Sequence, residues 1–171
     1  MMITQEKIDE LVSWDGLKEF GSFILSHCEN DALPDYGNIN ILQVPHLVPS
    51  IWVYDLRDDE KKEKLRLNFC GQKHVDMHGF NPMGMNDTDL FVGDPLIDRI
   101  NAFYEKSISE KKTGFTTRYK DYTLSTGEKH WRYLEFLFFP CSTDGHTVNW
   151  GIGCINFDIR PQNGENIFLH F

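Results

Sequence analysis

The sequence lacks the features that mark several common classes of protein. None of its four cysteines belongs to a CxxC pair, so neither a zinc site nor a thioredoxin-like redox motif is indicated. No apolar run approaches the roughly 20 residues that a membrane-spanning helix needs, and the acidic opening MMITQEKIDE has no apolar signal-peptide core. We therefore expect a cytoplasmic protein with reduced thiols, in which each cysteine is a small buried hydrophobic residue.

A surplus of positive charge is also missing. The net charge of the 171 residues is -9, whereas a nucleic-acid-binding surface needs a stripe of Lys and Arg that neutralises phosphates. The one lysine-rich run, at 61–64, is interleaved with glutamate and is typical of a solvated turn. We therefore expect no nucleic-acid partner and no docking on an anionic membrane.

The sequence does contain enough apolar material for one core. Hydrophobic residues make up 40% and charged residues 25% of the chain, as in ordinary folded domains of this length. Apolar residues of 4–28 recur at spacings of three and four, which predicts a helical segment. It is predicted to split near Asp15-Gly16, with Asp15 capping the second helix. Residues 29–40 are rich in Asn, Asp, Gly and Pro and predict a loop.

Five strands and a long helix are predicted downstream. Residues 50–56 and 64–70 flank a charged turn and predict a hairpin, whereas 115–124, 129–140 and 147–157 predict a three-strand meander. Between them, 94–112 is the clearest helix, with Asp94 as its cap, Pro95 in its first turn and Gly114 closing it. Strands joined by short turns pair antiparallel, so the pattern predicts a two-layer α+β fold.

Both faces of this sheet need a cover, because strand 129–140 is apolar on both sides. We expect helix 94–112 to cover one face, and the N-terminal helix or a second subunit to cover the other. On the last strand, Trp150, Ile152 and Cys154 share one face, while Ile155 and Phe157 lie on the other.

Four segments carry a resemblance to a known family: VPHLVPSIWVYDL, LRLNFCGQKHVDMHGFNPMGM, TGEKHWRYLEFLFFP and NWGIGCINFD. They resemble the PAS sensor domains, especially a bacterial subgroup that often occurs as a stand-alone domain. The resemblance implies a five-stranded antiparallel sheet with helices on one face, a ligand pocket beneath them and an N-terminal helical extension. It also implies a homodimer formed through the N-terminal helix. We accordingly divide the chain into an extension and loop at 1–40, a PAS-like domain at 41–160 and a C-terminal tail at 161–171.

Two cofactors used by PAS sensors are disfavoured by the residues present. Haem needs an axial ligand, commonly a histidine from the long helix, and 94–112 contains no histidine. Covalent flavin photochemistry needs a cysteine after the second strand, and His78–Asn86 has none; non-covalent flavin stays open. His74 and His78 are spaced to share a metal on a helix, but without a third ligand they favour a plain polar helix face, so we predict no metal.

An apolar and aromatic pocket with a few polar anchors is the site that the pattern favours. For each apolar candidate, plain core packing is the alternative. The predicted lining residues are Phe69, Val75, Met77, Met83, Ile100, Tyr104, Tyr119, Arg132, Leu134, Trp150 and Ile152, with Tyr119 and Arg132 as polar anchors. No catalytic residue is predicted, because strand alternation sends two candidate bases, His130 and Glu135, to opposite faces, and the third, His146, lies in a solvated hairpin turn.

These observations together predict a sensory module rather than an enzyme. It would bind a small apolar or amphipathic molecule and signal through contact with a partner protein. Two alternatives stay open: a pure protein-interaction module with a filled core, and an enzyme on a ketosteroid-isomerase-like fold. In that second fold the long helices precede most of the sheet, whereas here two predicted strands precede the main helix.

Overall fold

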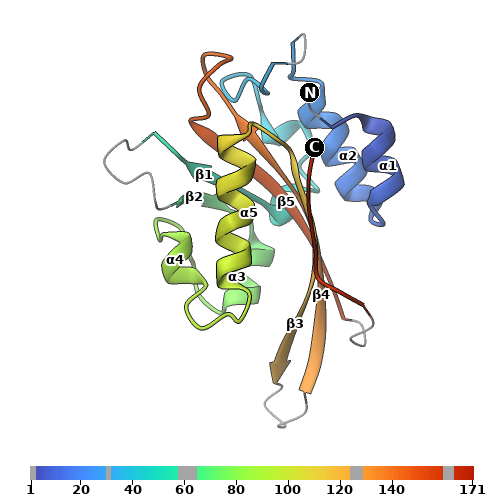
Figure 1. Cartoon of the computed structure of the whole chain (residues 1–171), viewed down its shortest axis with the longest axis vertical. Coiled ribbons are helices and arrows are strands. Elements are labelled where there is room, and N and C mark those ends of the chain that lie inside the picture. The colour runs from blue at the N-terminus through green and yellow to red at the C-terminus, as the bar shows by residue number, and fades with distance from the viewer. Residues whose placement is uncertain (1–2, 30–31, 58–64, 124–128, 160–163) are drawn as a thin grey trace.

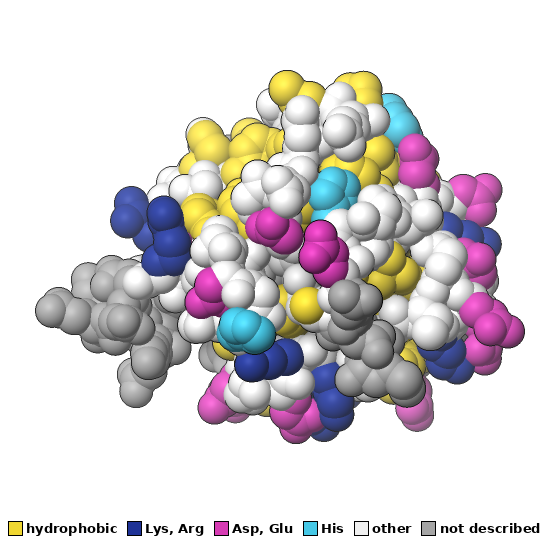
Figure 2. Space-filling model, turned by 90° about the horizontal axis from the view of Figure 1, so that it is seen from above, with side chains coloured by type: hydrophobic (Ala, Val, Ile, Leu, Met, Phe, Trp, Pro, Cys, Tyr) yellow, Lys and Arg dark blue, Asp and Glu magenta, His cyan; other side chains and the backbone are white. Residues whose placement is uncertain are grey.

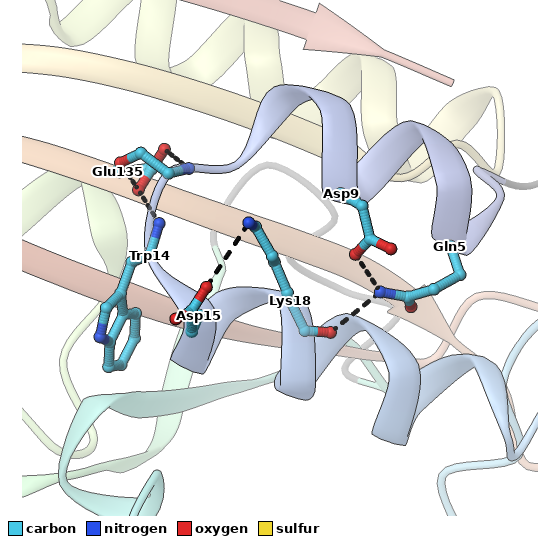
Figure 3. Close-up of polar contacts among 7 residues, drawn as sticks. Gln5, Asp9, Trp14, Asp15, Lys18 and Glu135 are labelled. Carbon is cyan, nitrogen blue, oxygen red and sulfur yellow. Dashed lines mark hydrogen bonds and ion pairs between the residues drawn. The ribbon is translucent and has the colours of Figure 1, made fainter.

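The N-terminal segment forms two helices that are tied to each other. The computed structural model describes residues 3–29, 32–57, 65–123, 129–159 and 164–171. Helix α1 (Gln5–Leu11) and helix α2 (Asp15–Leu25) are linked by Gln5, whose Nε2 donates to Asp9 Oδ1 at 2.7 Å and to the Lys18 carbonyl at 3.3 Å (Figure 3). The cap of α2 is Trp14 rather than the predicted Asp15. Asp15 is instead the first residue of the helix, where the positive end of the helix dipole stabilises its negative charge.

A six-stranded antiparallel sheet forms the centre of the molecule (Figure 1). The predicted hairpin and meander are confirmed by the pairing of β1 with β2, β3 with β4 and β4 with β5. The turns predicted at 58–63 and 125–127 lie outside the described residues. Along the sheet the order is β2-β1-β5-β4-β3-β6, and the strands are β1 (Ile51–Asp55), β2 (Arg66–Cys70), β3 (Gly114–Thr123), β4 (Lys129–Cys141), β5 (Trp150–Ile159) and β6 (Ile167–His170).

The sixth strand differs from the five that were predicted. The apolar end of the chain pairs antiparallel with β3 as β6, and Thr113 and Phe171 exchange backbone hydrogen bonds of 3.1 and 3.0 Å just beyond the ladder. Phe168 and His170 pack on Phe103, with ring centroids 5.9 and 5.0 Å apart. Pairing covers an edge of β3 that would otherwise expose unpaired backbone groups. A four-residue strand has too short a pattern to be distinguished in the sequence.

The helical layer between β2 and β3 consists of α3 (Gln72–His78), α4 (Asp87–Leu90) and α5 (Ile97–Ser109). Helix α5 begins later than predicted. Its cap is Leu96, and Asp94, two residues earlier, accepts a hydrogen bond from the Leu96 N–H at 2.9 Å. The helix ends before Lys111, whose φ is 55°, and Gly114 begins β3 instead of closing the helix. Two short 3-10 turns, Ile41–Gln43 and Val48–Ser50, lead into β1.

Different helices cover the two faces of the sheet, from opposite sides (Figure 1). Helices α1 and α2 bury one face, where Phe20 packs edge-on against Phe139 at 5.9 Å. Helix α5 covers the other face, where Phe103 and Tyr104 pack against Phe136 and Phe138. The second face of the sheet is therefore covered by the N-terminal helices rather than by a second subunit. No helix in the described part of the chain is long and apolar enough to cross a membrane.

Candidate functional site

A cavity of about 40 Å³ lies between the sheet and the layer of α3, α4 and α5. One buried water needs about 10–15 Å³ of such volume, so the cavity holds about three waters or a ligand of a few non-hydrogen atoms. The sheet contributes Trp52, Tyr54, Leu67, Arg118, Phe136 and Ile155, and the helical layer contributes His74, Met77, His78, Leu90, Phe91 and Tyr104.

Trp52 of β1 forms one wall of this cavity. Its ring lies over Gly153 of β5, where an added Cβ would come within 2.2 Å of a ring carbon. The indole meets Phe136 and His74 edge-on, at centroid distances of 5.3 and 5.4 Å. Its Nε1–H is buried and has no hydrogen-bond partner within the described part of the chain. A donor is thus held in a fixed position without an acceptor.

Arg118 of β3 brings a positive charge to the same cavity. The residue is 6% exposed and lies opposite Leu134 in the β3–β4 register. Its Nε finds no hydrogen-bond partner among the residues that the structure describes, and its guanidinium carbon lies 5.7 Å from the Phe136 ring centroid. Burial lowers the pKa of the guanidinium, while Tyr104 and Asp94 oppose that change. An arginine remains protonated in this setting.

Two buried phenols complete the polar part of the lining. The rings of Tyr54 and Tyr104 meet edge-on with centroids 5.4 Å apart. Burial raises the pKa of both hydroxyls, so both stay neutral at physiological pH. Asp87 lies near both phenols, but its Oδ1 already accepts the Leu65 N–H at 3.2 Å.

The two histidines of α3 pack against protein groups rather than forming a metal site in the described part of the chain. His74 is 7% exposed, and its Nε2 donates to the Ser50 carbonyl at 3.2 Å. Burial lowers the pKa of His74 to about 4, so the ring is neutral at pH 7. His78 lines the cavity half-buried beside Phe80, and burial lowers its pKa as well. Across the described ranges, no cluster of three His, Cys, Asp or Glu could hold a metal ion.

The structure places the predicted lining residues in four regions. Met77 and Tyr104 line the cavity described above. Val75, Ile100 and Leu134 belong to the core around that cavity without lining it. Met83 is exposed, and Arg132 is half-buried outside the lining.

The remaining predicted residues lie on the other side of the sheet. Phe69, Trp150 and Ile152 belong to the core that faces α1 and α2. Trp150 is held there by Tyr36, which stacks on it at 4.3 Å, and by the Arg57 guanidinium, 4.4 Å from its ring. These three residues therefore cannot touch a molecule in the α5-side cavity.

Tyr119 faces a second, larger hollow of about 340 Å³. Residues of β3, β4 and β6 line it together with Leu11 of α1. None of its described lining residues has a buried polar atom without a partner. Of the two hollows, only the smaller one has unsatisfied donors among its described lining residues.

Glu135, a predicted candidate base, has a structural role on the α1–α2 side. It is 1% exposed, and its two carboxylate oxygens accept hydrogen bonds from the Ser13 N–H, the Ser13 hydroxyl and the Trp14 N–H, at 2.8, 2.9 and 3.3 Å (Figure 3). The side chain of His130 lies outside the described residues. Because both of its oxygens are engaged by the backbone and side chain of 13–14 and the residue is buried, Glu135 is a structural acceptor that ties the α1–α2 junction to the sheet.

The cavity does not fit the two cofactors that PAS sensors are known to hold. A dry cavity of about 150 Å³ holds one benzene ring, and this one is about 40 Å³. The three fused rings of a flavin, or a haem, would overlap Trp52, Tyr104 and Phe136, whose rings fill the space between the layers. A ligand of this cavity must be far smaller than either cofactor.

Comparison with known proteins finds distant likeness in solved structures alone. No protein-family model matches the chain, and no curated protein matches it. The LOV domain of the blue-light activated histidine kinase from Erythrobacter litoralis EL346 is 18% identical, with a TM-score of 0.41, and the match covers 65% of this chain and 96% of that one.

Two further structures illustrate the range of the matches. The Rhodobacter sphaeroides LOV protein is 11% identical with a TM-score of 0.44, over 86% of this chain and 69% of that one. The Vibrio cholerae VqmA dimer is 13% identical with a TM-score of 0.45, over 70% and 52%. Likeness at this level carries no ligand or activity to this chain. The PAS-like α+β fold predicted from the sequence is established by the chain's own strand order and helical layer.

Proposed function

We propose that this protein is a PAS-type sensory module whose ligand site is the cavity between the sheet and α3–α5. The observation that carries the proposal is a partly open aromatic cavity whose lining includes two residues with buried donors, Trp52 Nε1 and Arg118 Nε, that lack partners among the described residues. Buried polar groups in folded proteins are nearly always hydrogen-bonded. A bound molecule that accepts from both donors would complete this site.

The segment that joins α3 to α4 supports a route from the cavity to a partner protein. Met77 and His78, at the end of α3 just before it, and Leu90, at the end of α4 after it, line the cavity. On its outside, Phe80 is 47% and Met83 46% exposed. The segment is flanked by residues that line the cavity and carries exposed apolar side chains on its outer side. A ligand that enters the cavity and shifts this segment would therefore also change the exposed apolar surface. We propose that a partner protein contacts this surface; a homodimer through the N-terminal helix stays a prediction.

The distribution of charge favours a protein partner over a nucleic acid. Seen from above, Lys and Arg side chains are interspersed with Asp and Glu rather than gathered into a stripe (Figure 2). The net charge of -9 points the same way, since phosphate binding needs clustered cations.

The proposal is tested by native mass spectrometry and thermal shift on the whole chain. Purified protein is screened against a panel of small metabolites, beside Met77→Phe, which fills the cavity, and Gln72→Phe, which adds the same ring on the exposed side of α3. We expect binders of wild type and of Gln72→Phe to lose affinity at least tenfold for Met77→Phe. Binding that survives Met77→Phe unchanged would place the site elsewhere and overturn the proposal.

A second candidate is the pure interaction module with a filled core. The small volume favours it, because the rings of Trp52, Tyr104 and Phe136 already occupy most of the space. It predicts no thermal shift with any metabolite of the panel, in wild type or either variant. It also predicts that Met77→Phe is stabilising, since the added ring would fill a void with no other use.

A further inference from the structure

We propose that the ligand of the cavity is a small carboxylate, anchored by Arg118 and Trp52. The inference rests on the proposed function and adds the chemical class of the molecule. It starts from two residues on different strands, β3 and β1, that line one cavity and each have a buried N–H without a partner among the described residues.

The first argument is charge. Arg118 is 6% exposed, and no carboxylate oxygen of the described residues lies within ion-pair distance of it. Asp94 acts on Arg118 only through space, because its oxygens are engaged by the Leu96 N–H at 2.9 Å and by Lys120 Nζ at 3.5 Å. A buried charge is ordinarily paired. Water can solvate this guanidinium, but only an anion neutralises it.

The second argument is hydrogen-bonding chemistry. Arg118 Nε and Trp52 Nε1 are both N–H groups, and neither side chain can accept. A carboxylate accepts at two oxygens, so one oxygen can take each donor. Tyr54 and Tyr104 line the same space, and burial keeps their hydroxyls neutral, so this phenol pair can donate as well as accept. A cationic ligand would meet a like charge at Arg118.

The third argument is size and the apolar part of the lining. A volume of about 40 Å³ admits a molecule of only a few non-hydrogen atoms. Beside the donors, the walls are apolar and include Leu67, Met77 and Ile155. A carboxylate with a one- or two-carbon tail, the size of acetate or propionate, satisfies the donors at one end and the walls at the other.

Proton-detected NMR of the two donors tests this directly. The N–H resonances of Trp52 Nε1 and Arg118 Nε are followed while acetate or propionate is added at pH 7 and constant ionic strength. Acetamide and propionamide, which have the same shape without the charge, are the matched probes. Arg118→Gln removes the anchor, and Arg66→Gln removes an exposed arginine of β2 as the control.

The outcomes separate this inference from the proposed function. A carboxylate site is supported if both resonances shift saturably with the acids and the amides bind with at least tenfold lower affinity. The shifts with the acids should also be lost in Arg118→Gln and kept in Arg66→Gln. Equal binding of acids and amides, or of neutral molecules alone, overturns the carboxylate while leaving a ligand cavity. No saturable shift with either acid overturns the carboxylate, and no binding by any probe or panel metabolite overturns both. The comparison of acid with amide in wild type keeps the test decisive if Arg118→Gln fails to fold.

Discussion

Glu135 of β4 and Ser13, between α1 and α2, are joined by two hydrogen bonds across 122 positions of sequence. The Ser13 N–H donates to Oε1 at 2.8 Å and its hydroxyl to Oε2 at 2.9 Å. The pair fixes the break between the two helices on the sheet (Figure 3). It also explains why a buried carboxylate, the residue type most often suspected of acid–base chemistry, has a structural role in this protein.

Removing that carboxylate should destabilise the fold. Glu135→Ala removes the acceptor of the part-buried hydrogen bonds from the Ser13 and Trp14 N–H groups, so we expect the free energy of unfolding to fall by about 2 kcal/mol in urea titrations. Glu135→Gln keeps an acceptor and should lose about half as much. Glu105→Ala, on the exposed side of α5, is the control and should change little. Equal losses at 105 and 135 would refute the assigned role.

His74 should make stability depend on pH in a defined window. Its pKa is about 4 when folded against 6.5 ordinarily, so between these values the unfolded chain binds a proton that the folded chain does not. Stability is then full above pH 6.5, falls as the pH drops toward 4, and loses no more below that. At about 1.4 kcal/mol per tenfold difference in proton affinity, the loss totals about 3 kcal/mol.

The contribution of His74 is isolated by comparing variants. In His74→Phe, denaturant titrations from pH 7 to pH 4 should show a fall in the free energy of unfolding that is smaller than in wild type by that amount. His146→Asn, in an exposed turn, should keep the wild-type slope. A His74→Phe profile parallel to wild type would show that His74 does not titrate as described.

Gly153 should be intolerant of any side chain, because the Trp52 ring rests on it. An added Cβ would lie 2.2 Å from a ring carbon, so Gly153→Ala should cost about 1–3 kcal/mol in thermal or urea unfolding. The double variant with Trp52→Leu should recover part of that loss, since the smaller side chain no longer meets the Cβ. Strictly additive losses would argue that the close approach is not the cause.

The paired tail should contribute to stability although it is only four residues long. Phe168 packs on Phe103 and lies under the Arg99 guanidinium, 4.5 Å away. We expect Phe168→Ala to lower the free energy of unfolding by about 2 kcal/mol and to speed hydrogen exchange at the Thr113 and Phe115 amides, because β6 would separate from β3. Leu42→Ala, at an exposed apolar position, should show neither effect. Unchanged exchange in Phe168→Ala would mean that β6 does not depend on this contact.

The sequence predicted the elements and the faces within each strand better than the relation between strands. It placed Ile155 and Ile152 on opposite faces of the same strand, as observed, because side chains alternate along a strand. Which face of one strand continues onto a face of the next depends on register, and a shift of one residue reverses it. Leu134 was therefore grouped with Trp150 although the two lie in different cores.

Because register could not be predicted, Arg118 was not identified as the polar residue of the cavity. Tyr119 was chosen on the third strand, whereas its neighbour Arg118 is the residue that shares a face with Leu134 and Phe136. A charged residue in a strand is normally exposed, and nothing in the sequence marks one that is buried. Trp52 was missed for a related reason, because the glycine that turns it toward the cavity lies 101 positions away on β5.

The most direct test of a ligand site on the α5 side is a set of intermolecular nuclear Overhauser effects from bound small molecules to methyl groups. Ile155 and Ile152 lie on the same strand, but the first faces the cavity and the second faces α1 and α2. We predict contacts from a bound molecule to the methyls of Ile155 and Met77 and none to Ile152. Contacts to Ile152 without Ile155, or binding that reaches neither Ile155 nor Met77, would contradict the account.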